Sequence, residues 1–191
     1  DAGWDVVVLE AAPEPGGAVR TAELITPGFH HDVFSAFYPF AAASPVMRHL
    51  ALDDHGLVWR RSPAVLAHPT LNGPTAVLSS GPDETACSLD RFAPGDGGRW
   101  RLLMEPWERG GDALVDALMR PFPPVRAAAR MAVRFGPSDL REFARLAVSP
   151  VHRLGEEWFH GAGGRLLLAG LALHADLGPD AAGSGFYGWL L

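Results

Sequence analysis

The sequence contains a single cysteine, Cys87, and no lysine. One cysteine excludes an internal disulfide and a Cys-x-x-Cys redox site, and it fits the reducing conditions of the cytoplasm. All 16 basic residues are arginines, and the net charge of −6 does not suit an extended nucleic-acid-binding surface. We therefore expect no nucleic acid partner.

Long apolar runs are missing too. The longest, such as residues 166–173, fall well short of the about 20 residues that a membrane-spanning helix needs. This excludes a transmembrane helix and leaves a peripheral contact with a membrane surface open. The hydrophobic content of 48% is still ample for a folded core, in one large domain or in parts of two.

The motifs of nucleophilic and metal-dependent enzymes do not occur. The sequence has no G-x-S-x-G, H-E-x-x-H or Walker pattern, so a hydrolase has no support. His30, His31 and Asp32 are adjacent, but neighbouring side chains of a strand point to opposite sides. No further ligand stands at a useful spacing, and we expect no metal site.

Residues 5–21, DVVVLEAAPEPGGAVRT, carry the most specific pattern. The apolar run at residues 6–9 shows no alternation, which predicts a strand buried on both faces of a parallel sheet. Glu10 follows at the end of that strand. An acidic residue there is typical of a carboxylate that binds the ribose of an adenosine, although it is also what the first solvated residue after a strand would look like.

The residues after Glu10 favour a cofactor site. Pro13 and Pro15 keep the chain extended, the Gly16-Gly17 pair permits close approach of the backbone, and Arg20 adds a permanent cation. This constellation resembles the second-strand region of FAD-dependent oxidoreductases of the phytoene desaturase and amine oxidase superfamily.

The resemblance implies an enzyme that passes hydride from a C–H bond of an apolar small-molecule substrate to FAD. It also implies which residues contact the cofactor, in residues 10–20 and again in residues 32–39, where small side chains would line the flavin end. Phe34 stands where relatives often have a smaller residue. The implied cofactor-binding residues are Glu10, Ala11, Gly16, Gly17, Arg20, Ser35 and Ala36. No residue is selected as the catalytic base, and the substrate's identity and the oligomeric state stay undetermined.

In that family a G-x-G-x-x-G loop lies roughly 20 residues before the acidic residue. Glu10 is only the tenth residue here, so we expect the chain to be a fragment that begins inside a helix. Residues 180–191 are typical of the first turns of another helix, with an exposed apolar end at Trp189 and Leu190. The segment Gly161-Ala162-Gly163 imitates a nucleotide loop, but it lacks the third glycine and a preceding strand, so we interpret it as a tightly packed helix start.

The remaining chain predicts short antiparallel strands followed by helices. Strands are expected at residues 57–60, 64–68 and 75–78, and helices at residues 45–52, 83–91, 99–119, 125–135, 138–148 and 151–159. Pro106 and Gly110-Gly111 are expected to interrupt the helix at 99–119. Arg126, Arg130 and Arg134 recur on one helix face, as a solvated face or as a surface for anionic lipid headgroups.

Together these observations predict an α/β plus α+β fold. An incomplete Rossmann-type FAD-binding portion, residues 1–45, would be followed by a partial substrate domain, residues 46–191, with an antiparallel sheet and mostly helices. The alternative from another class is a non-catalytic remnant that binds a protein partner or a membrane surface.

Overall fold

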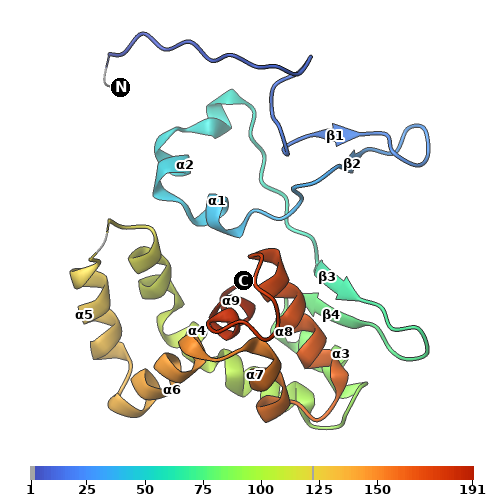
Figure 1. The fold of residues 1–191 in the computed structure, drawn as a ribbon, viewed down its shortest axis with the longest axis vertical. Helices are drawn as coiled ribbons and strands as arrows, with labels where there is room; N and C mark the ends of the chain where they lie inside the picture. Colours follow the sequence, from blue (N-terminus) through green and yellow to red (C-terminus); the bar gives the residue numbers. More distant parts are fainter. Residues whose placement is uncertain (1–2, 122) are drawn as a thin grey trace. The chain divides into compact units, whose positions relative to one another are not determined.

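A computed structural model describes residues 3–121 and 123–191 of the chain. The protein is mixed α/β, 51% helical, with two small antiparallel sheets of two strands each (Figure 1). The chain divides after Ser44 into two compact units, which are described separately below. The domain boundary expected from the sequence lies one residue further along, between residues 45 and 46.

The first unit consists of a small hairpin, one short helix and extended chain. Strands β1 (Thr21–Ala22) and β2 (His31–Asp32) pair in an antiparallel register, and helix α1 spans Pro39–Ala43. None of the residues described in this unit is buried. Two strands of two residues each cannot enclose a core, because a lone hairpin buries too little apolar surface.

The strand predicted at residues 6–9 is not formed. These residues are extended but unpaired, and their four side chains are 70–90% exposed. The prediction of a strand buried in a parallel sheet is therefore wrong for this chain. A strand needs a hydrogen-bonded neighbour, and neither described sheet contains a parallel pair for it to join.

The second unit contains one hairpin and a helical assembly. The hairpin pairs β3 (Ala64–His68) with β4 (Ala76–Ser79). The helical elements are α2 (Pro45–His49), a 3-10 turn (Leu52–His55), α3 (Pro82–Asp90), α4 (Asp96–Leu118), α5 (Val125–Arg134), α6 (Pro137–Val148), α7 (Val151–Trp158), α8 (Ala162–His174) and α9 (Ser184–Leu190). The antiparallel hairpin and all the predicted helices are thus confirmed, whereas residues 57–60 form no strand.

Helix α4 runs without interruption through the proline and the two glycines that were expected to break it. Pro106 lies inside the helix, and a Cβ atom added to Gly110 would lie 2.4 Å from the ring of Phe135. The buried Phe135 therefore occupies the space that a side chain at position 110 would need. Here glycine permits the packing of a neighbouring segment rather than a break in the helix.

The core of this unit gathers around α8 and α9, which lie side by side (Figure 1). Leu167, Leu168 and Phe159 are almost fully buried. Trp189 and Leu190, expected to form an exposed apolar end, are buried as well, and the indole Nε1 of Trp189 donates a hydrogen bond to the Leu103 carbonyl at 2.8 Å. That expectation was wrong because the last helix folds back onto α4.

Candidate functional site

The hairpin of the first unit brings together two of the segments predicted to contact a cofactor. The Val33 amide donates to the Arg20 carbonyl at 2.8 Å, and the Ser35 amide donates to the Ala18 carbonyl at 3.3 Å. The Thr21 hydroxyl also donates to the Asp32 carboxylate at 2.9 Å. Residues 18–22 and 31–35 therefore run next to each other, although Ala18 and Ser35 are 17 residues apart in the sequence.

The glycine pair before β1 has the backbone that only glycine adopts readily. Gly16 has φ +127° and Gly17 φ +57°, both in the region that disfavours side chains. A Cβ atom on Gly16 would lie 2.6 Å from the Val19 carbonyl oxygen and would clash with it. A Cβ atom on Gly17 would meet nothing within 4 Å. Gly16 is thus required by its own turn, and Gly17 leaves open space beside the chain.

The side chain of Arg20 lies over the ring of Phe34, two residues after the end of β2. Its guanidinium carbon is 5.7 Å from the centroid of the Phe34 ring, which is itself exposed. An exposed cation–π contact of this kind contributes about 0.5–1 kcal/mol. Phe34 therefore orients Arg20 on the surface of the hairpin.

Glu10 and Ala11 are exposed and lie on the extended chain that precedes the hairpin. The carboxylate of Glu10 accepts a hydrogen bond from the Ala12 amide at 2.8 Å, a contact within its own turn. The expectation that Glu10 stands at the tip of a buried strand is wrong for this chain, because residues 6–9 have no sheet to end. Glu10 and Ala11 are therefore not joined to the hairpin by a described hydrogen bond.

The histidines of the hairpin are not part of a described cluster of metal-binding side chains. His31 pairs with Ala22 across the sheet, and His30 Nε2 is 3.9 Å from a carboxylate oxygen of Glu23. Within residues 3–121 and 123–191, no three histidine, cysteine or acidic side chains lie close enough to share a metal ion.

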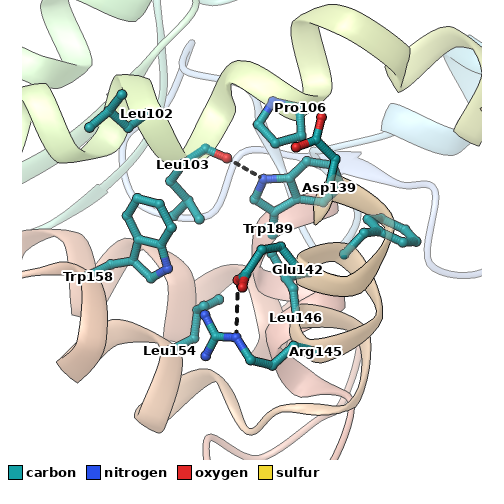
Figure 2. Close-up of a pocket in the computed structure, with 11 residues that line it drawn as sticks. Leu102, Leu103, Pro106, Asp139, Glu142, Arg145, Leu146, Leu154, Trp158 and Trp189 are labelled. Carbon is teal, nitrogen blue, oxygen red and sulfur yellow. Dashed lines mark hydrogen bonds and ion pairs between the residues drawn. The ribbon is translucent and has the colours of Figure 1, made fainter. Parts of the chain in front are cut away.

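A pocket of about 160 Å³ opens in the second unit between α4, α6, α7 and α9, and sequence reasoning did not identify it (Figure 2). Its walls are mainly apolar, with two indoles and one phenyl ring, and its polar side chains all come from α6. The lining residues are Leu102, Leu103, Pro106, Asp139, Glu142, Phe143, Arg145, Leu146, Leu154, Trp158 and Trp189. No sequence pattern predicts this pocket, because its lining residues come from four helices and lie up to 87 residues apart, from Leu102 to Trp189.

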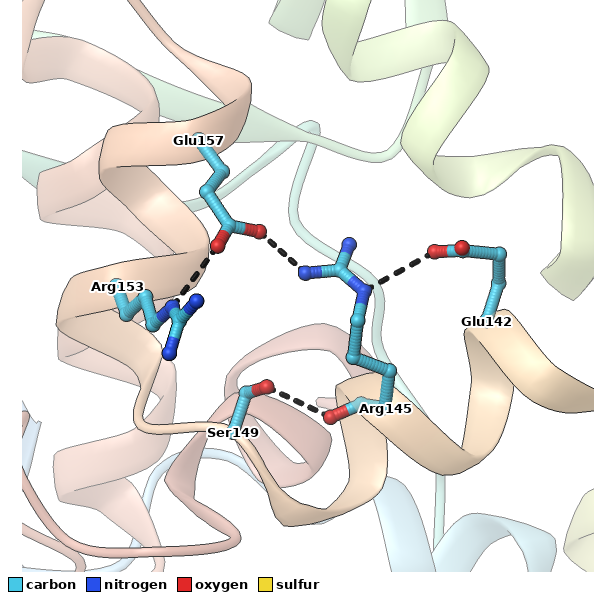
Figure 3. A network of polar contacts seen from close by, with 5 residues as sticks. All are labelled: Glu142, Arg145, Ser149, Arg153 and Glu157. Carbon is cyan, nitrogen blue, oxygen red and sulfur yellow. Dashed lines mark hydrogen bonds and ion pairs between the residues drawn. The ribbon is translucent and has the colours of Figure 1, made fainter.

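A chain of ion pairs joins α6 to α7 beside this pocket (Figure 3). Arg145 pairs with Glu142 at 3.2 Å and also with Glu157, which in turn pairs with Arg153 at 2.9 Å. The hydrogen bonds from Arg145 and then Arg153 lower the pKa of Glu157, and the hydrogen bond to Glu157 raises the pKa of Arg145. Both groups are therefore held in their charged forms.

Proline shapes the α4 wall of the pocket. Because Pro106 has no amide hydrogen, the Leu102 carbonyl lacks the donor that an α-helix normally supplies. The next carbonyl, that of Leu103, accepts the indole hydrogen bond from Trp189. The proline thus stands where α9 docks on α4, at the edge of the pocket.

The glycine-rich helix starts of the second unit serve packing. Cβ atoms on Gly163 and Gly164 would lie 2.6 and 2.5 Å from the rings of Phe92 and Phe159, which confirms the interpretation of a closely packed helix start. Gly183-Ser184-Gly185-Phe186-Tyr187-Gly188 also matches G-x-G-x-x-G, a match that our sequence analysis missed. No strand precedes it, and a Cβ atom on Gly188 would lie 2.5 Å from the Leu168 carbonyl oxygen. Here too, neighbouring residues occupy the space beside the glycine.

The arginine face of α5 is paired with acids of α4. Arg130 forms an ion pair with Asp116, and Arg134 forms one with Asp112. The arginines are exposed, yet two of the three have carboxylate partners within the protein. This pairing reduces the positive charge that the face could offer to anionic lipids.

Comparison with known proteins finds no matching family model, no similar curated protein and no similar solved structure. Within the described part of the chain, no helix is long and apolar enough to cross a membrane. The function therefore has to be inferred from the residues and their arrangement.

Proposed function

We propose that this chain is part of a FAD-dependent oxidoreductase resembling the phytoene desaturase family. The residues that would contribute to its cofactor site are Glu10, Ala11, Gly16, Gly17, Arg20, Ser35 and Ala36. The substrate of such an enzyme would be an apolar small molecule that loses hydride from a C–H bond. The flavin supplies the redox chemistry, so the chain's own task is to bind the cofactor and to orient it.

The observation that carries the proposal is the hairpin. The resemblance names Gly16, Gly17 and Arg20 in one segment and Ser35 and Ala36 in another, and the β1–β2 pairing lays these segments side by side through the Ser35-to-Ala18 hydrogen bond. Residues that serve one ligand must converge in space, and the contact between these two segments supports the proposal for the part of the site that they would form. The pairing is independent of the sequence pattern that named them.

The chemistry of the individual groups suits the cofactor in part. The Glu10 carboxylate gives one oxygen to the Ala12 amide, and a carboxylate has enough lone pairs to accept ribose hydroxyls as well. Gly17 leaves open space where a ligand could approach the backbone, and Arg20 offers a fixed charge beside it. The exposed run at residues 6–9 would have to be covered by a sheet for a complete site to exist.

The test is the colour and FAD affinity of the protein expressed from its complete gene. A yellow protein with absorption bands near roughly 370 and 450 nm supports the proposal. In that protein, Glu10→Gln should weaken FAD binding by about ten- to a hundredfold, since a charge-assisted hydrogen bond contributes about 1.5–3 kcal/mol. The matched control is Glu14→Gln, an exposed acid in the same turn, which should leave FAD affinity unchanged.

A colourless protein that added FAD cannot reconstitute would refute the proposal and favour the alternative, a non-catalytic module that binds a partner or a membrane surface. Equal losses of affinity in the two glutamate variants would refute the role of Glu10 alone. Residues 1–9 contain no G-x-G-x-x-G pattern, and we expect residues 1–191 alone to bind FAD only weakly. Submicromolar affinity of this chain would contradict that expectation.

A further inference from the structure

We propose that the pocket between α4, α6, α7 and α9 binds a small organic cation, a flat apolar body that carries one positive charge. This inference does not rest on the proposed FAD site, because every residue it uses belongs to the second unit.

The apolar walls fix the shape and size of the ligand. Trp158, Trp189 and Phe143 supply aromatic surface, and aliphatic side chains of α4, α6 and α7 complete the walls (Figure 2). A cavity of about 150 Å³ accommodates one benzene molecule, so the 160 Å³ available here suits a single aromatic ring. A polar group attached to the ring would then reach the mouth of the pocket.

The charged side chains that line the pocket determine whether this polar group should be positive or negative. Two carboxylates, Asp139 and Glu142, line the pocket together with the guanidinium of Arg145, and Asp139 is already paired with Arg109 at 3.0 Å. Arg145 already donates Nε to Glu142 and a second nitrogen to Glu157, so its charge is compensated from two sides. An anion would have to compete with both acids for the same guanidinium, whereas a cation would add to the pairing.

Glu142 is the group best placed to receive the cation. Its side chain is 66% exposed, and its contact with Arg145 is the longest in the α6–α7 network, at 3.2 Å (Figure 3). An amidinium or guanidinium could bind its carboxylate through two parallel hydrogen bonds without displacing the Arg145–Glu157 pair. Aromatic faces nearby add a favourable field for positive charge.

A second pocket of the same unit provides an internal contrast. It measures about 180 Å³ and is also lined by Trp189, but its lining side chains are all apolar or aromatic, among them Leu78, Trp100 and Leu171. The two pockets are similar in size and in aromatic content. Of these two pockets, the one beside α6 combines an aromatic wall with carboxylates, so it offers a selectivity for charge that the other lacks.

The experiment titrates the chain with three probes of the same shape and different charge: benzamidine, benzamide and benzoate. Binding is followed at low salt through the indole N–H signals of Trp158 and Trp189 in NMR spectra. We expect benzamidine to bind with a Kd on the order of 1 mM, as fits a ligand of nine heavy atoms, and about tenfold more tightly than benzoate. Benzamide should fall between them.

Glu142→Gln should remove most of the preference for benzamidine, reducing its affinity about fivefold while benzamide binding stays the same. Glu84→Gln, an exposed acid on α3 outside the pocket, is the matched control and should change nothing. If Glu142→Gln disturbs the circular dichroism spectrum, Asp139→Asn takes its place. Equal affinities for the three probes, a preference for benzoate, or no shift of the two indole signals at tens of millimolar probe (about tenfold above the expected Kd) would overturn the proposal.

Discussion

Asp96 should be the most sensitive single carboxylate of the second unit. It is fully buried at the start of α4, and its two oxygens accept hydrogen bonds from the amides of His160 at 3.0 Å and Gly161 at 2.8 Å. These amides belong to the turn between α7 and α8, more than 60 residues further along. Asp96 thus connects the start of α4 to the start of α8. It satisfies the amide of Gly161, the N-cap residue of α8, and the amide of His160 just before it.

Asp96→Ala would remove both acceptors and leave two amides without a partner. A buried donor without a partner costs about 1–3 kcal/mol, so the free energy of unfolding should fall by about 2–5 kcal/mol. Asp96→Asn keeps one acceptor oxygen and turns an amide nitrogen toward the other donor. Its loss should be smaller, about 1–3 kcal/mol.

Asp90 offers a matched control in the same loop. Its carboxylate also accepts two backbone hydrogen bonds, from Gly95 at 3.0 Å and Gly97 at 2.9 Å, but the residue is exposed. Water can replace the lost acceptor at the exposed Gly95, and Asp90→Ala should reduce the free energy of unfolding by about 1 kcal/mol.

Urea unfolding followed by near-ultraviolet circular dichroism measures the difference, because the buried tryptophans report on the packing of α4, α8 and α9. With a urea slope of about 2 kcal/mol/M, Asp96→Ala should lower the midpoint by about 1–2.5 M and Asp90→Ala by about 0.5 M. Equal shifts for the two alanine variants would refute the reasoning, since burial is the main difference between the sites.

Two further outcomes follow from the same unit. Gly110→Ala should destabilise the unit by about 1–3 kcal/mol because the new methyl group would collide with Phe135. Gly98 lies on the same helix with open space around it, so Gly98→Ala should stabilise the unit by about 0.5–1 kcal/mol. Thermal unfolding of the two variants measures whether the changes have opposite signs. The pKa of Glu157 is lowered below its ordinary 4.5 by Arg145, so its contribution to stability is present above pH 4.5 and is lost as the pH falls through the lowered pKa. Glu157→Gln should flatten the acid limb of a stability–pH curve, and an unchanged limb would contradict this assignment.

The helices that the sequence predicted well are those with local signals at their ends. Helix α6 begins at the proline of a Gly-Pro pair and ends before Pro150, and α7 begins directly after Pro150. The starting residue of α6 was missed by one, since Pro137 and not Ser138 opens the helix. Such boundaries depend on the few residues around them, and a sequence pattern contains that information.

The features that the sequence did not predict depend on distant partners. Pro106 and Gly110 are local signals for a break, and α4 continues through them because Phe135 and Trp189, from other segments, pack against it. A proline inside a helix costs about 3 kcal/mol, an amount that burial of two aromatic side chains can offset. The pocket beside α6 was missed for the same reason, as its wall residues come from four helices whose arrangement no single segment encodes.

The run at residues 6–9 is the point at which the sequence pattern and the structure disagree most. Four branched apolar side chains in succession indicate burial on both faces, and burial of each would contribute about 1.5–3 kcal/mol, yet all four are exposed. The first unit has no sheet that could cover them, so this free energy is not gained within the unit as described. The same residues precede Glu10, the group to which the resemblance gives the ribose contact. The proposed ribose contact of Glu10 therefore requires that residues 6–9 be buried in a sheet, because a carboxylate can end a buried strand only where a neighbouring strand exists.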